Sequence, residues 1–121
     1  MTNAERRRAG VPELQENPKL TTAAQLQSDQ MGSASQMDHV LPGAPYPSPS
    51  DRLAAVAYSW AAYGENVAMG QRSEAEVVSA WMNSASHRAN ILNPSYTEFG
   101  FGVAKDANGR PYYAEMFGRP R

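Results

Sequence analysis

Three side chains carry most of the chemistry that this sequence could support. His39 and His87 are the only histidines, and each lies in a segment rich in polar and small residues. Glu65 lies between them in the stretch AYGENVAMG, just before an apolar run at residues 67–69. Neutral imidazoles and a carboxylate are ligands for zinc and other divalent cations. The three residues therefore form a candidate metal site, without the His-Glu-x-x-His spacing that marks a helical zinc motif.

A structural explanation for the same residues stays open. A carboxylate at the mouth of an apolar strand must be solvated, paired or bound, and a solvated glutamate in a turn meets that condition. A single histidine in a surface loop is more often inert than a ligand. If the three side chains converge, we expect Glu65 to form a hydrogen bond with one imidazole. We expect the amide of Asn66 to tie the end of the strand to nearby backbone.

Other catalytic groups are weakly represented. Ser84 and Ser86 lie near His87 in sequence, but there is no Gly-x-Ser-x-Gly motif, and helix capping accounts for both serines. The chain has no cysteine, which excludes thiolate catalysis, disulfides and cysteine-based zinc sites. We therefore expect no peptidase, esterase or nuclease turnover.

The composition limits the class of protein. The 121 residues, 41% of them apolar, suit one domain over residues 1–121. A formal net charge of -1 gives no basis for binding nucleic acid or an anionic membrane surface. No apolar run approaches the ~20 residues of a transmembrane helix. The first residues contain no apolar signal-peptide segment, so we expect either a cytosolic protein or one whose signal has been removed.

The order of the predicted elements that position these side chains indicates an α+β domain, because helices come first and antiparallel strands last. The histidine at position 39 falls in an irregular stretch, residues 32–50, which contains four prolines. Loops of that length are usually functional or disordered. Hydrophobic spacing and capping residues predict helices over 3–9, 17–32, 52–60, 73–84 and 86–92. Alternation and turn residues predict a strand at 67–69 and a hairpin with strands at 99–104 and 112–117.

Four segments then occur in an order typical of one family. They are GENVAMG at 64–70, WMNSASHRANIL at 81–92, YTEFGFGV at 96–103 and YYAEMFG at 112–118. In these segments the sequence resembles the CAP superfamily of cysteine-rich secretory, antigen 5 and pathogenesis-related proteins, and its bacterial SCP-like branch above all. The resemblance covers essentially the whole chain and implies a three-layer α-β-α sandwich with a small antiparallel sheet between helices.

The resemblance also implies a cluster of histidines and acids at the floor of a cleft, able to bind zinc or another divalent metal. His39, Glu65 and His87 match that cluster. Animal and plant members carry an acid where this chain has Ser84 and a histidine where it has Tyr112. Glu115, at a position where glutamine is usual, is a possible fourth ligand. Asn66, Ser84 and Tyr112 would then support the cleft.

The family's activities are mostly not enzymatic, so the resemblance implies a secreted-type binding module for a lipid, sterol or other small apolar ligand. The alternatives are a domain that binds a protein or cell-wall partner, and a peptidase-like hydrolase that uses the His/Glu cleft. The proline-rich residues 42–49 are the candidate wall of a ligand groove, with Tyr46 as its aromatic contact. The implied location is extracellular or in the cell envelope, and the implied state is a monomer.

Overall fold

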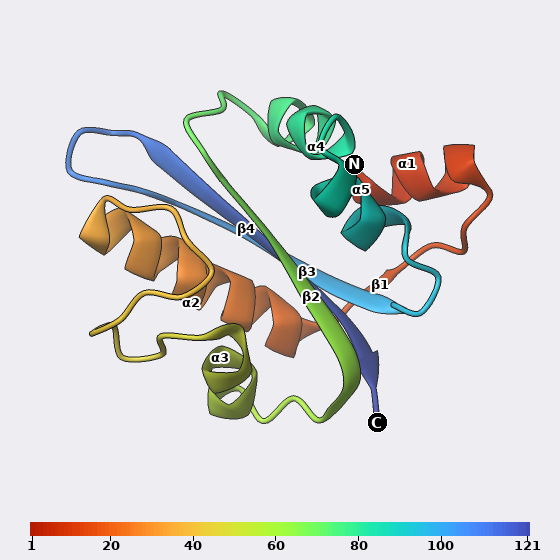
Figure 1. Cartoon of the computed structure of the whole chain (residues 1–121), viewed down its shortest axis with the longest axis horizontal. Helices are drawn as coiled ribbons and strands as arrows, with labels where there is room; N and C mark the ends of the chain where they lie inside the picture. Colours follow the sequence, from red (N-terminus) through yellow and green to blue (C-terminus); the bar gives the residue numbers. More distant parts are fainter.

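The computed structural model describes residues 1–121 as five helices and a four-stranded sheet. Three layers are formed, with the sheet in the middle, α2 and α3 on one side, and α1, α4 and α5 on the other (Figure 1). In chain order the elements are α1 Thr2–Ala9, β1 Gln15–Glu16, α2 Pro18–Ala34, α3 Pro49–Ala55, β2 Trp60–Met69, α4 Glu74–Met82, α5 Ala85–Leu92, β3 Glu98–Lys105 and β4 Pro111–Pro120. The predicted α+β class and α-β-α sandwich are confirmed.

The sheet order β1-β3-β4-β2 places β4 in the interior and β2 at an edge. Strands β2 and β3 both pair antiparallel with β4, whereas the two-residue β1, which the sequence pattern did not reveal, pairs parallel with β3. The sheet is therefore mixed, and the antiparallel hairpin predicted at the end of the chain is its central part.

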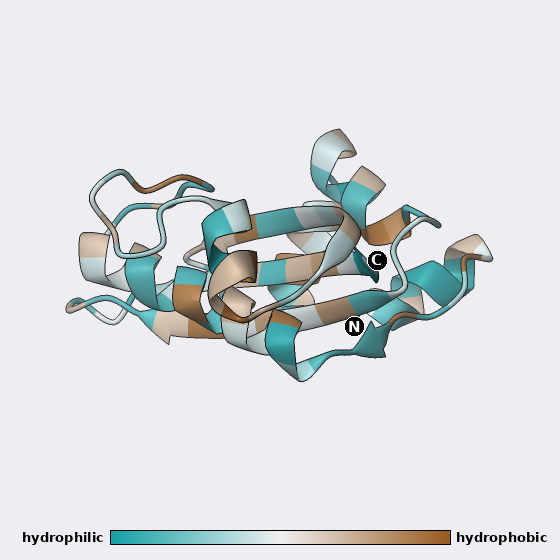
Figure 2. Ribbon diagram, turned by 90° about the horizontal axis from the view of Figure 1, so that it is seen from below, coloured by the Kyte–Doolittle hydropathy of each residue, from teal (hydrophilic) through white to brown (hydrophobic).

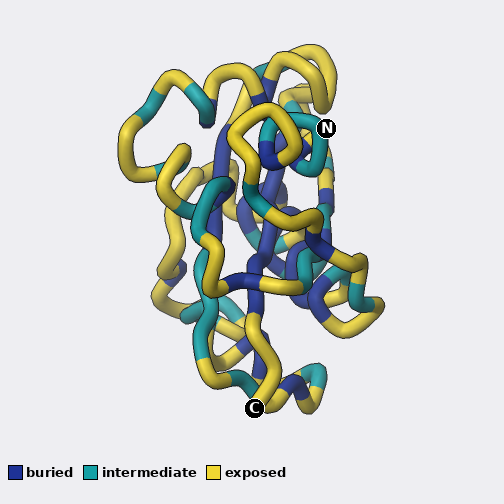
Figure 3. Tube along the Cα trace, turned by 90° about the vertical axis from the view of Figure 1, so that its right-hand side faces the viewer, coloured by how far each residue is buried: buried dark blue, intermediate teal, exposed yellow.

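Two hydrophobic cores lie on the two faces of the sheet, because alternate residues of a strand point to opposite faces. Along β4, Tyr112, Ala114 and Met116 pack with α2 and α3 residues such as Leu20 and Leu53. Tyr113 and Phe117 pack instead with residues of α4 and α5, including Trp81 and Ile91. Figure 3 shows the buried residues following the central strands between exposed outer helices.

Close packing of α2 on β3 depends on the two glycines of Phe99-Gly-Phe-Gly. A Cβ at Gly100 would overlap the backbone of Thr21, and one at Gly102 would lie 2.7 Å from the backbone nitrogen of Gln25. The alternation predicted as a strand thus also lets a helix approach the sheet directly.

Three predicted boundaries were wrong. The third helix ends at Ala55, not at Trp60, and Ser48 caps it through a capping box with Asp51. Strand β2 begins at Trp60 because residues 60 and 62–69 pair with β4, with a shift in register at residue 61. Strand β4 continues to Pro120, past the predicted end at residue 117. The predicted helix starts at residues 17 and 73 are confirmed, with Asn17 and Ser73 as the N-caps of α2 and α4.

Polar and apolar residues are interleaved along the elements (Figure 2). None of the helices combines the length and the apolar character that crossing a membrane requires.

Candidate functional site

Glu65 is a buried carboxylate on an otherwise apolar face of the sheet. Its side chain is 2% exposed, and it lies opposite Met116 in the β2–β4 register, on the face covered by α2 and α3. The solvated-turn explanation is therefore excluded, because a buried carboxylate needs partners.

Arg52 of α3 is the main partner of Glu65. Its Nη2 donates to both carboxylate oxygens, at 3.1 Å to Oε1 and 2.9 Å to Oε2, and its side chain is fully buried. Sequence reasoning missed this residue.

His39 completes the cluster from the loop between α2 and α3. Its Nδ1 lies 2.9 Å from Glu65 Oε1, and the expectation that Glu65 bonds one imidazole is confirmed. The side chain is 46% exposed. The hydrogen bond to the carboxylate raises the pKa of His39 against the opposing effect of burial. The imidazolium form is thereby favoured, with Glu65 as its counter-ion.

The loop that carries His39 is held by side chains of its neighbours. Arg52 donates to the backbone carbonyls of His39, Tyr46 and Pro47 at 2.9–3.3 Å. The amide of Gln30 makes two hydrogen bonds with the backbone of Tyr46. The proline-rich loop is therefore an ordered part of the fold and is fastened to the same arginine as Glu65.

His87 lies in α5, in the helical layer opposite α2 and α3. Its ring forms a hydrogen bond with Ser84. Its Nδ1 is 3.0 Å from Ser84 Oγ. Ser84 stands at the N-cap of α5, but its hydroxyl makes no capping hydrogen bond, so the capping role expected for it was wrong. Burial, followed by the positive charge of His39 nearby, lowers the pKa of His87 and favours the neutral ring.

Asn66 connects strand β2 to helix α5. Its Nδ2 donates to the backbone carbonyl of His87 at 3.1 Å, and its Oδ1 accepts from Asn90. The expectation that its amide ties the strand to nearby backbone is confirmed.

Glu115 does not join Glu65 on the same face of the sheet. It lies opposite Asn66 in the register, so its side chain is on the other face of the sheet. It is 1% exposed, and Thr2 Oγ1 donates to both of its oxygens at 2.9 Å. Burial raises the pKa of Glu115 to about 8.

Tyr112 lies at the hairpin end of β4. Its hydroxyl donates to Asp106 at 3.0 Å, within the turn between β3 and β4. The structure thus uses this tyrosine to fix a turn rather than to support the Glu65 cluster.

The donors around Glu65 do not fit a divalent cation. No group of three or more histidine and acidic side chains is arranged to hold a metal ion. An ion bound to Glu65 at ~2 Å would also lie within about 5 Å of the Arg52 guanidinium. At that separation, with an effective dielectric constant of about 20, two unit positive charges repel by about 3 kcal/mol, and a dication more.

A cleft of about 350 Å³ runs along the outer edge of β2, between that strand and α4 with the start of α5. We call it the edge cleft. Its apolar lining is Met37, Val67, Ala68, Met69, Ala80 and Trp81, and its polar lining is Gln71, Ser84 and His87. The Ser84–His87 pair therefore lies at an apolar cleft, and Gln71 Oε1 is a buried acceptor without a partner.

Side chains of the neighbouring elements protect the exposed edge of β2. Carbonyls of alternate β2 residues each accept a hydrogen bond from a side chain rather than from another strand. The pairs are Tyr63 with Tyr96, Glu65 with Asn90, and Val67 with Trp81. Such capping removes the acceptors that would otherwise pair with a foreign strand, so the cleft is better suited to a side chain or a small molecule than to strand addition.

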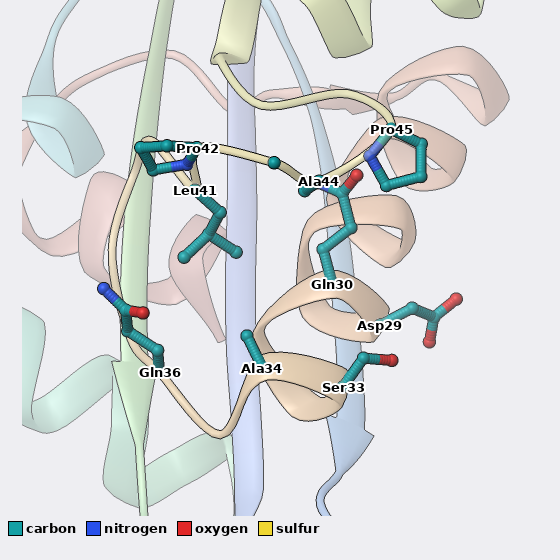
Figure 4. A pocket seen from close by; sticks show the side chains of 10 residues that line it. Asp29, Gln30, Ser33, Ala34, Gln36, Leu41, Pro42, Ala44 and Pro45 are labelled. Atoms are coloured by element: carbon teal, nitrogen blue, oxygen red, sulfur yellow. The ribbon is translucent and has the colours of Figure 1, made fainter.

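The proline-rich loop forms a wall of a second hollow, of about 490 Å³, against the end of α2 (Figure 4). Leu41, Pro42 and Pro45 lie on the loop side, and polar residues such as Asp29 and Gln36 lie on the other. Tyr46, the expected aromatic contact, is 39% exposed and does not line the hollow.

Comparison with known sequences identifies relatives over most of the chain. The family described as CAP, cysteine-rich secretory protein family, matches residues 1–117. The chain is 41% identical over 108 residues to the uncharacterized protein YkwD of Bacillus subtilis, covering 89% of this chain and 41% of YkwD. It is 31% identical over 117 residues to the uncharacterized membrane protein YlbC of the same bacterium, covering 97% and 32%. The chain thus spans less than half the length of either relative.

Solved structures share the fold. An extracellular protein of Bacillus anthracis that contains an SCP domain superposes with a TM-score of 0.84 at 28% identity, over 98% of this chain and 37% of that one. An outer surface protein from Borrelia burgdorferi superposes with a TM-score of 0.88 at 22% identity, over 99% and 87%. At that identity the second similarity concerns the fold alone.

Proposed function

Because this chain belongs to the cysteine-rich secretory protein family, CAP, we propose that it is a binding domain without catalytic activity that holds an apolar ligand in the edge cleft. The observation that carries the proposal is the lining of that cleft, six of whose nine residues are apolar. Burial of apolar ligand surface against Met37 and Met69, the exposed large apolar side chains of the cleft, supplies the affinity, at roughly 25 cal/mol per Å².

The polar end of the cleft determines which apolar ligands fit. Ser84 has a hydroxyl, His87 has a ring whose Nδ1 is already bonded, and Gln71 has an unpartnered acceptor. These groups match a ligand with one polar head on an apolar body, such as a fatty acid or a sterol. Fatty acids and sterols share this chemistry, and binding measurements distinguish the two ligand types.

One relative supports a location outside the cytoplasm. The Bacillus anthracis protein, which is 28% identical, is described as extracellular. We place the domain in the extracellular space or the cell envelope.

Equilibrium titration with a dansyl-labelled fatty acid and with a fluorescent sterol tests the proposal. We expect micromolar affinity for at least one of the two probes. Ala80→Phe should weaken that affinity at least tenfold, because Ala80 is an exposed residue that lines the cleft, and the larger ring fills it.

Ala75→Phe is the matched control. Ala75 is also an exposed alanine of α4, and it does not line the cleft. Equal weakening in both variants, or no binding of either probe, would leave a protein or cell-wall partner as the better account of this domain.

A further inference from the structure

We propose that Arg52 is a resident cation that takes the place of a divalent ion beside Glu65, so that the site forms without metal. The inference starts from the arrangement of charges. One buried nitrogen of Arg52 contacts both oxygens of Glu65, and one of those oxygens also contacts His39. Both oxygens of the carboxylate therefore already have a cationic partner in Arg52.

Arg52 cannot leave this position without moving the loop. Its guanidinium donates to the carbonyls of His39, Tyr46 and Pro47 as well as to Glu65, and the side chain is fully buried. A metal ion that displaced it would leave a buried arginine without its carboxylate, which is strongly unfavourable.

The arginine also does the structural work that a bound ion would do. It joins a carboxylate on β2 to a loop between α2 and α3 through one positively charged centre. Among the expected ligands, His39 meets Glu65 through Nδ1, whereas His87 is engaged with Ser84 instead. The cluster is thus an ion pair that holds the loop against the sheet.

Zinc chloride, added to EDTA-treated protein, is the probe. Calorimetry should give no heat of zinc binding, and thermal unfolding should give no shift of the midpoint on adding zinc, for both the wild type and His39→Ala. His39 is half exposed, so this variant is expected to fold. Zinc binding by the wild type that disappears in His39→Ala would overturn the proposal.

Removing the arginine should create a metal site. In Arg52→Met, Glu65 and His39 are free to bind zinc, and we expect an affinity at least tenfold tighter than that of the wild type, with a midpoint that rises on adding zinc. The added change Glu65→Gln should abolish the gain. A folded Arg52→Met variant that gains no zinc affinity would show that the arginine is not what excludes the ion.

Arg6→Met controls for the loss of a buried arginine. Arg6 is 1% exposed and donates only to backbone carbonyls, among them those of Pro12 and Ile91. This variant should lose stability like Arg52→Met but gain no affinity for zinc. A similar gain in both variants would mean that zinc binds to loosened protein, and would also overturn the proposal.

Discussion

At the scale of single residues, the partner of a carboxylate decides what it can do. Glu65 paired with an arginine is a fixed anion, whereas the same glutamate beside two free imidazoles would be a metal ligand. The contact between Glu65 and His39 could be predicted from the residue types and the family resemblance. Arg52 could not be predicted as its partner, because only the packing of α3 on the sheet brings a residue 13 positions away to the same point.

The Ser84–His87 pair has the right atoms for ester hydrolysis but lacks the rest of the machinery. The ring of His87 is hydrogen-bonded to Ser84 and to no carboxylate, and Glu65 is bonded to His39 and Arg52. Without a group that orients the base and stabilises its charged form, a serine hydroxyl is a poor nucleophile.

We expect hydrolysis of p-nitrophenyl acetate and butyrate at the same rate with wild type, Ser84→Ala and His87→Ala, no faster than with an inert protein. The assay is absorbance of the released nitrophenolate at neutral pH. Turnover that is present in the wild type and lost in both variants would support the hydrolase alternative.

At the scale of elements, boundaries set by local sequence were predicted better than boundaries set by long-range strand pairing. Asn17-Pro18 and Ser73 set the starts of α2 and α4 by their own chemistry, and both starts were predicted. Strand β2 was predicted only at residues 67–69, because its first half owes its extended form to pairing with β4 and has little apolar alternation. Such pairing is long-range and leaves no local pattern.

The packing of α2 on β3 gives a test at this scale. Gly100→Ala should lower the free energy of unfolding by about 1–3 kcal/mol, the range for overpacking a core, because the new methyl group meets the backbone of Thr21. Urea unfolding followed by circular dichroism measures the change. Val103→Ala, at a 43% exposed position of the same strand, is the control and should change stability far less. Equal effects would mean that α2 can move away from the sheet at little cost.

At the scale of the whole molecule, the two faces of the sheet have separate buried polar centres. Arg52 and Glu65 join α3 and its loop to one face, while Glu115 and Thr2 join α1 to the other. The first centre is a pair of opposite charges. The second has an acid with no basic side chain among its hydrogen-bond partners, so burial favours its protonated form. The two faces should therefore respond differently to pH.

Glu115 should make the domain less stable as the pH rises. Its pKa is about 8 in the folded protein, against an ordinary value of 4.5. Burial is the main cause of the raised pKa. The Thr2 hydrogen bond lowers the pKa, and the charge of Glu74 raises it further. Between these values the folded protein keeps a proton that the unfolded chain has lost, so stability falls with rising pH, by up to about 1.4 kcal/mol per unit.

The raised pKa of His39 also lowers stability as the pH rises, because its stabilising charge is lost as the pH passes the folded pKa. The lowered pKa of His87 has the opposite effect on stability. Thermal unfolding between pH 5 and pH 8 should therefore be compared in the wild type, Glu115→Gln and His39→Gln. We expect the decline to be clearly smaller in Glu115→Gln, whose neutral amide needs no proton, and largely retained in His39→Gln, because His39 is half exposed and its ion pair is partly screened. If Glu115→Gln declines as steeply as the wild type, the carboxyl group of Glu115 is ionised in the folded protein, where the positively charged N-terminus already opposes the effect of burial.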